Sequence, residues 1–197
     1  PVIADLEAQG INKIVLLSHI GYADDQTLAA AIDGIDVIVG GHSHTLLANT
    51  IEGASGPYPT VVDSPSGAPV LIVQAEAYGK YLGNLEVTFD ADGVASAWQG
   101  EPLLLDPSVA EDPDVLARVQ ALGQSLAELR NTVVGQSAID LDGSRTSCRF
   151  GECTMGNLIA DAMLWATQND GARVAIENGG GIRASLPAGD VTRGGVL

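Results

Sequence analysis

Two short apolar runs with a helical segment between them constrain the fold more than any other feature of the sequence. The runs occupy residues 13–17 and 36–39 and are mostly aliphatic, which is typical of buried strands. The segment 24–32 has helical composition, and its acidic first turn suits the helix dipole. Strand, helix and strand within about 30 residues predict a βαβ unit with parallel strands. We therefore expect an α/β fold, with ligand-binding groups in the loops after the strands.

The rest of the chain carries weaker signals for loops, a domain boundary and further secondary structure. Residues 49–69 are rich in Gly, Pro and Ser and are expected to form a loop. An acidic, proline-bearing stretch at 106–113 predicts a boundary, with one domain over 1–110, a linker helix over 111–131 and a second domain over 132–197. Periodicity predicts these further elements: strands over 70–75, 133–141 and 173–176, a hairpin over 82–98, and helices over 2–9, 114–129 and 154–167, the last capped by Thr154.

Composition excludes several classes of protein. The net charge of −16 disfavours a partner as negative as DNA or RNA. A hydrophobic share of 46% is too high for a disordered polymer. No stretch reaches the roughly 18 consecutive apolar residues that a membrane-spanning helix needs. Oligomeric state is not predicted by any of these features.

The three histidines provide the first chemical signal, because each directly follows a predicted strand. His19 comes after the first apolar run, and His42 and His44 come after the second. Gly40 and Gly41 allow the backbone to turn sharply before the latter two. Since imidazole is the commonest metal ligand in proteins, this placement favours a metal site. Ordinary polar loop residues are the alternative.

The arginines provide the second signal, because all of them lie after residue 110. The guanidinium group offers a planar fork of donors that suits phosphate or carboxylate. Arg145 and Arg149 are four residues apart, and Arg183 ends the glycine-rich stretch 178–183. Such a loop lets backbone N–H groups approach a ligand closely. A plain tight turn and solvated surface arginines are the alternatives.

The two cysteines, Cys148 and Cys153, are too few to form a zinc site by themselves, because tetrahedral zinc is bound by four ligands. We expect a local disulfide between them, which would imply an oxidising compartment. Two small buried thiols are the alternative.

Several segments together resemble one known family. The sequence is similar to the 5'-nucleotidase family, in which a calcineurin-like metallophosphoesterase domain precedes a substrate-binding domain; UDP-sugar hydrolases and animal ecto-5'-nucleotidases belong to it. The resemblance is carried, in the family's order, by residues 17–21, 38–45, 77–83, 147–158 and 178–183.

The resemblance implies roles for individual residues. His19 and His42 match histidine ligands of one of two divalent metal ions (Zn, Mn, Mg or Co), and His44 matches a position that completes the other site. Arg145, Arg149 and Arg183 match arginines that grip the phosphate or ribose end of a nucleotide, whereas Asn178 and Gly181 match loop positions at the nucleoside. The cysteine pair matches a disulfide of the animal branch. The implied setting is periplasmic, cell-surface or extracellular.

The resemblance also implies a reaction and a fold. The expected reaction is removal of phosphate from nucleotides by attack of a metal-bound hydroxide on phosphorus, with nucleotide sugars and cyclic nucleotides as further candidate substrates. The expected fold is the C-terminal half of a four-layer metallophosphoesterase β-sandwich, a linker helix and the N-terminal part of an α/β substrate-binding domain.

Two departures from the family pattern concern motifs that we do not find. The family's Asp-x-His and Gly-Asn-His motifs, which supply further ligands and the assisting histidine, are absent from this sequence, as is the aromatic pair that stacks on the base. We therefore expect an internal part of a longer enzyme that is inactive alone. A fragment with weak phosphate binding, or a relative that hydrolyses a sulfur compound, are the alternatives.

Overall fold

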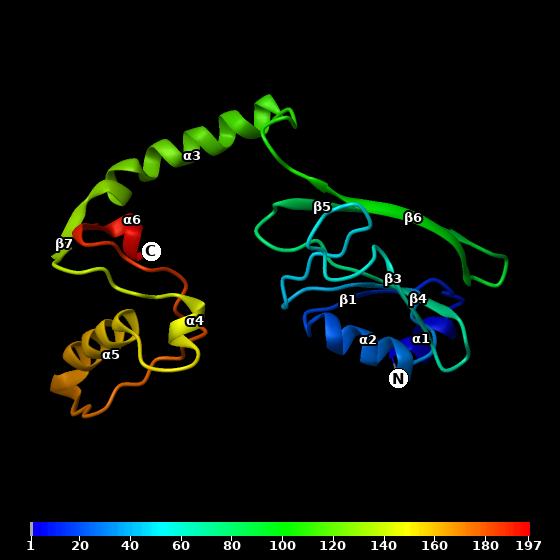
Figure 1. Cartoon of the computed structure of the whole chain (residues 1–197), viewed down its shortest axis with the longest axis horizontal. Helices are drawn as coiled ribbons and strands as arrows, with labels where there is room; N and C mark the ends of the chain where they lie inside the picture. The colour runs from blue at the N-terminus through cyan, green and yellow to red at the C-terminus, as the bar shows by residue number, and fades with distance from the viewer. Residues whose placement is uncertain (1) are drawn as a thin grey trace. The chain divides into compact units, whose positions relative to one another are not determined.

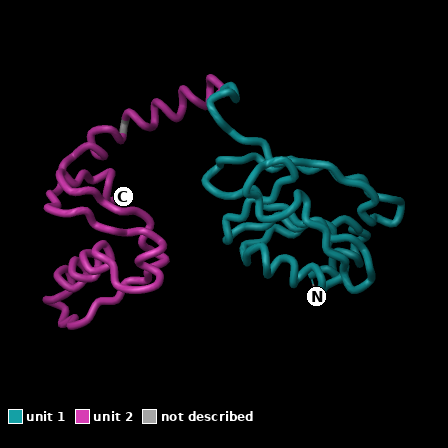
Figure 2. Tube along the Cα trace, viewed as in Figure 1, with its two compact units in different colours: residues 1–110 teal, residues 111–197 magenta. Residues whose placement is uncertain are grey.

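The computed structural model describes residues 2–197, the side chain of Ser125 excepted. It divides the chain into two compact units, residues 1–110 and 111–197 (Figure 2). The mixed α/β class is confirmed, since both units combine helices with strands.

The first unit is built on a four-stranded sheet with the order β1-β2-β4-β3. Strands β1, β2 and β4 run parallel, and β3 runs antiparallel to β4. The predicted βαβ unit is therefore confirmed. The elements of this unit are α1 (Val2–Glu7), β1 (Val15–Leu17), α2 (Tyr22–Ala31), β2 (Val37–Val39), β3 (Thr60–Asp63), β4 (Pro69–Val73), β5 (Tyr81–Phe89) and β6 (Ala95–Leu104).

The two faces of this sheet are covered by different elements (Figure 1). Ile38, Val70 and Ile72 pack with Ala29 of α2 on one face. Val37 and Leu71 alternate with these residues along the strands, and they pack with the predicted hairpin β5–β6 on the other face. The alternation follows from the two-residue period of a strand, and it gives the sheet an apolar core on both sides.

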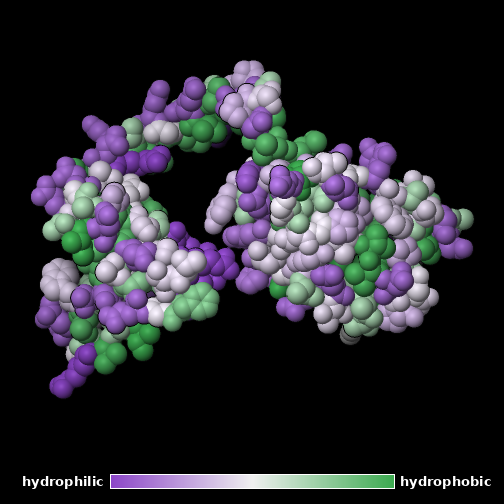
Figure 3. Space-filling view, in the orientation of Figure 1, coloured by the Kyte–Doolittle hydropathy of each residue, from purple (hydrophilic) through white to green (hydrophobic). Residues whose placement is uncertain are grey.

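The second unit begins with α3 (Pro113–Asn131), whose N-cap Asp112 accepts hydrogen bonds from the backbone N–H groups of Asp114 and Val115. Val115, Val119 and Leu126 of its predicted apolar face are exposed, and apolar groups are visible along this helix in Figure 3. The other elements are β7 (Val133–Ser137), α4 (Arg145–Cys148), α5 (Thr154–Thr167), η1 (Gln168–Asp170), β8 (Gly189–Thr192), which pairs antiparallel with β7, and α6 (Arg193–Val196).

Three local predictions are wrong. Residues 60–63 lie in the predicted loop but form β3, because pairing with β4 outweighs the Gly, Pro and Ser content around them. Residues 173–176 form no strand, and Val174 and Ile176 are exposed, because within residues 2–197 no neighbouring strand pairs with them. The first run is not buried, since Leu17 is 79% exposed on β1 at the edge of the sheet.

The cap of α5 also differs from the prediction. The N-cap is Cys153, whose Sγ accepts a hydrogen bond from the N–H of Gly156 at 3.3 Å. Thr154 Oγ1 instead accepts a hydrogen bond from the backbone N–H of Asp142 at 2.7 Å. In the described part of the chain, no helix is both long and apolar enough to cross a membrane.

Candidate functional site

The loops after β1 and β2 bring two of the three histidines together. The rings of His19 and His42 meet edge to face, with centroids 5.2 Å apart and an interplanar angle of 74°. A Cβ atom on Gly41 would lie 2.9 Å from His19 Nδ1, so the close approach of the two loops depends on glycine there. Both imidazoles are exposed at the carboxyl end of the parallel strands, where ligands bind in sheets of this kind.

His44 has a different neighbour. Its ring contacts that of Tyr78 edge to face, with centroids 5.4 Å apart. His42 and His44 both have positive φ angles, 71° and 54°. Such backbone geometry is uncommon outside glycine and is found preferentially at functional sites.

A buried carboxylate beside these loops was missed by sequence reasoning, which took it for part of an ordinary acidic helix start. Asp25 on α2 is fully buried, and its Oδ1 accepts a short hydrogen bond from the hydroxyl of Ser18, the residue before His19. Its Oδ2 has no hydrogen-bond partner among the described residues and lies against Gly40. The carboxyl group of Asp25 thus lies next to both histidine loops.

The donor set fits part of a site for a divalent transition metal. Imidazole nitrogens suit Zn²⁺ and comparable ions. Among residues 2–197, no group of three or more His, Cys, Asp or Glu side chains is arranged to hold an ion. His19 and His42 would therefore be two members of a larger set, and the ligand roles of all three histidines stay predictions.

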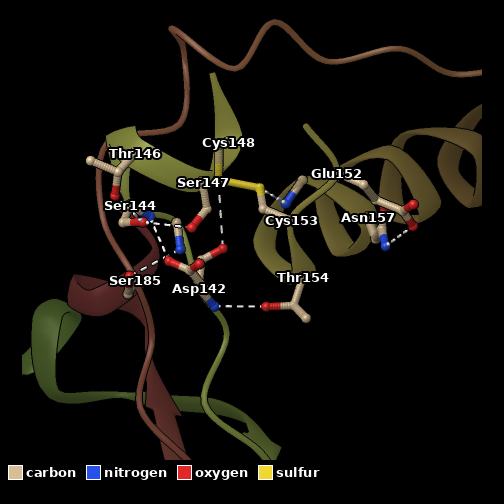
Figure 4. The surroundings of a disulfide bond; sticks show 12 residues. Asp142, Ser144, Thr146, Ser147, Cys148, Glu152, Cys153, Thr154, Asn157 and Ser185 are labelled. Carbon is tan, nitrogen blue, oxygen red and sulfur yellow. Dashed lines mark hydrogen bonds between the residues drawn. A yellow bond between two sulfur atoms is a disulfide. The ribbon is translucent and has the colours of Figure 1, made fainter. Parts of the chain in front are cut away.

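The second unit places its expected substrate residues around a disulfide. Cys148 and Cys153 are joined, as expected (Figure 4). The bridge closes the turn between α4 and α5, and it packs with Met155 and Ile182 in an apolar cluster. Arg145 begins α4 and Arg149 directly follows it, so the bridged turn anchors both arginines to the core.

The glycine-rich loop packs directly on this bridged turn. A Cβ atom on Gly179 would overlap the backbone carbonyl of Cys148 and would lie 3.4 Å from the Cα atom of Arg149. Asn178 closes the loop as a turn, because its carbonyl accepts from the N–H of Gly181 at 2.7 Å. The structure thus brings the Arg149 segment and the 178–183 loop together, although they lie about 30 residues apart in the chain.

The three candidate arginines are available to an anion. Arg145, Arg149 and Arg183 are exposed, and no carboxylate among the described residues forms an ion pair with any of them. Arg183 and Gly181 also line a cavity of about 630 Å³ between α5 and the β7–β8 pair, whose other walls are mainly apolar.

Asp142 organises the turn that precedes Arg145. Its carboxylate accepts a hydrogen bond from the backbone N–H of Ser144 at 2.8 Å (Figure 4). Hydrogen bonds from the Ser147 side chain and from Ser144 hold the pKa of Asp142 below its ordinary value. Its backbone carbonyl accepts from the N–H of Met155 at 3.1 Å, which ties the turn to α5.

Known proteins resemble the chain over nearly its whole length. Residues 133–197 match the family model described as 5'-nucleotidase, C-terminal domain. A 5'-nucleotidase of Diplobatis ommata is 42% identical over 194 residues, and a snake venom 5'-nucleotidase of Crotalus adamanteus is 40% identical over 192 residues; each alignment covers 92% of this chain. The crystal structure of a 5'-nucleotidase precursor from Thermus thermophilus aligns with a TM-score of 0.77, 47% identity and 99% coverage of this chain.

The chain belongs to the 5'-nucleotidase family. The matched proteins are much longer than this chain, which spans 33% of each of the two relatives and 39% of the solved Thermus chain. The resemblance inferred from the sequence motifs is thereby confirmed, as is the expectation that the chain corresponds to part of a family member.

Proposed function

We propose that the protein containing this chain removes phosphate from nucleotides with the help of two divalent metal ions. The observation that carries the proposal is the meeting of the His19 and His42 rings at the carboxyl end of the sheet, in a chain of the 5'-nucleotidase family. The bound ions would supply Lewis acidity at the phosphoryl oxygens and lower the pKa of an attacking water.

In this proposal, residues of the first unit hold the two metal ions and orient the histidines that bind them. His19 and His42 would hold one ion through their imidazoles, and His44 would contribute to the site of the second. The buried carboxyl group of Asp25 lies against Gly40, at the start of the loop that carries His42 and His44. Its bond to Ser18 fixes the residue that precedes His19.

The residues of the second unit bind the nucleotide. Arg145, Arg149 and Arg183 donate charge-assisted hydrogen bonds to its phosphate or ribose end. Asn178 and Gly181 contact the nucleoside through the side-chain amide and the backbone. The absence of carboxylate partners for these arginines among the described residues supports this role, since a paired guanidinium would have fewer donors to offer.

Family membership and the arginines favour a nucleotide over a sulfur compound, because a phosphate is the better match for guanidinium forks. Nucleotide sugars and cyclic nucleotides are further candidate substrates.

An oxidising compartment, periplasmic, cell-surface or extracellular, is supported by the disulfide and by the similarity to a venom enzyme. The domain limits 1–110, 111–131 and 132–197 are part of the same proposal.

Phosphate release from AMP by the complete protein tests the proposal. We expect hydrolysis with Mn²⁺ or Zn²⁺, none after chelation, and loss of most activity in His42→Ala. Gln99→Ala, an exposed residue of β6, serves as the control and should keep full activity. Undiminished turnover of His42→Ala would remove this residue from the metal centre.

A further inference from the structure

The histidine loop after β2 is bonded to a buried amide that neither the motifs nor the proposed mechanism uses. Gln74 directly follows β4 and is only 3% exposed. Burial of a glutamine is costly unless its amide finds partners. Its partners here all belong to the segment 41–45, which carries His42 and His44.

The side chain of Gln74 contacts this segment on both sides of the two histidines. Its Oε1 accepts hydrogen bonds from the N–H of Thr45 at 2.5 Å and from the hydroxyl of Ser43 at 3.1 Å. Its Nε2 donates to the carbonyl of Gly41 at 3.3 Å. A backbone N–H only donates and a backbone carbonyl only accepts, so these partners fix which end of the amide faces which group.

These bonds explain how two strained residues persist. His42 and His44 have positive φ angles, and such conformations hold only where the surroundings over-determine them. Gln74 bonds to the residue before His42, the residue between the histidines and the residue after His44. One side chain thereby defines the backbone from which both imidazoles extend.

The same network reaches the other histidine loop. Ser43 Oγ accepts a hydrogen bond from the N–H of Tyr22 at 3.1 Å, at the start of α2. Tyr22 is three residues after His19, and a Cβ on Gly21 would make an ordinary van der Waals contact with the His42 ring, 3.7 Å from Cδ2. The path Tyr22–Ser43–Gln74 therefore connects the two loops whose rings meet.

We propose that Gln74 is a positioning residue for the metal centre, holding the 41–45 segment in the conformation in which His42 and His44 bind divalent ions. This inference rests on the proposed function. Partners that orient metal ligands in this indirect way typically account for 10–100-fold in metal affinity.

The test uses the complete protein and two variants of similar shape. Gln74→Met keeps the length of the side chain and removes all three bonds, whereas Gln99→Met makes the same change at an exposed position of β6. We expect Gln74→Met to speed hydrogen exchange in the peptide covering 40–47 of the metal-free protein. Its affinity for Mn²⁺ should fall about 10–100-fold, and saturating Mn²⁺ should restore AMP hydrolysis. Gln99→Met should change none of these.

Ser43→Ala is the second variant, in case Gln74→Met does not fold. It removes the link between Tyr22 and Gln74 at an exposed residue, and we expect a smaller loss of Mn²⁺ affinity in the same direction. Unchanged exchange and unchanged Mn²⁺ affinity in folded Gln74→Met would overturn the inference. If the wild-type protein binds no Mn²⁺, the proposed function fails, and the positioning role fails with it even where exchange is faster.

Discussion

The imidazole rings of His19 and His42 meet edge to face at 5.2 Å, although they come from loops after two different strands. Their meeting follows from the parallel pairing of β1 with β2, which places both strand ends at one edge of the sheet. Gly41 permits the approach, because any side chain there would press on His19 Nδ1. This contact is the structural basis for the proposed metal centre.

Replacing Arg149 should weaken nucleotide binding. Its guanidinium is exposed, follows α4 directly and lies beside the glycine-rich loop. Loss of a hydrogen bond to a charged group costs about 1.5–3 kcal/mol, so Arg149→Ala should raise KM for AMP roughly 10–100-fold. Arg149→Lys should recover only part of this, because lysine keeps the charge and loses the fork.

Steady-state kinetics of AMP hydrolysis by the complete protein measure this effect. Arg173→Ala is the control, since Arg173 is an exposed arginine of the same unit that is outside the proposed site. An equal change of KM in both variants would mean that general charge, and not a specific contact, attracts the nucleotide.

Gly40→Ala should destabilise the first unit. A Cβ at this position would overlap Oδ2 of the buried Asp25 and would lie 3.0 Å from Nε2 of Gln74. Overpacking of a filled interior typically costs about 1–3 kcal/mol, and urea unfolding should show a loss of that size. Gly123→Ala within α3 has nothing within 4 Å of its Cβ and should stabilise the helix by about 0.5–1 kcal/mol. Equal effects of the two substitutions would contradict the packing argument.

Opening the disulfide should loosen the turn that carries Arg145 and Arg149. Cys148 and Cys153 enclose a short loop, for which chain entropy gives about 2 kcal/mol of stabilisation. Thermal unfolding should therefore show a lower Tm for the second unit after reduction or in the double variant Cys148→Ala/Cys153→Ala. A reductant should have no further effect on the double variant, and a wild-type Tm unchanged by reduction would refute the prediction.

The contribution of Asp142 to stability should depend on pH. Hydrogen bonds from Ser147 and Ser144 hold its folded-state pKa below the ordinary value of 3.8. The ionised group therefore stabilises the fold above about pH 4, and this contribution is lost as pH falls through the lower, folded-state pKa. We expect Asp142→Asn to be less stable than wild type at pH 7, with a gap that narrows below pH 4. A gap that stays constant from pH 7 to pH 2 would contradict this assignment.

Local pattern was enough to predict most of the fold. The βαβ unit, the hairpin β5–β6 and the helices α3 and α5 follow from periodicity and turn residues within each segment. The strand β3 could not be found in this way, because its pairing with β4 is a tertiary effect. The opposite error occurs at 173–176, where a strand is expected and none forms. Among residues 2–197, the β-branched residues of this segment have no neighbouring strand to pair with.

The candidate site was predictable at its exposed residues and not at its buried ones. His19 and His42 could be found because both follow apolar strands. Asp25 and Gln74 carry no such signal, because their importance comes from burial and from partners distant in sequence. Two acidic residues at a helix start look like an ordinary response to the helix dipole, and only the fold shows that one of them is enclosed.

The central claim is that His19 and His42 hold the same divalent ion. Anomalous scattering from crystals of the complete protein with Zn²⁺, recorded at the zinc absorption edge, tests it most directly. The account predicts a peak about 2.0–2.1 Å from a ring nitrogen of each of the two histidines. Zinc peaks elsewhere, with both rings free of the ion, would contradict it.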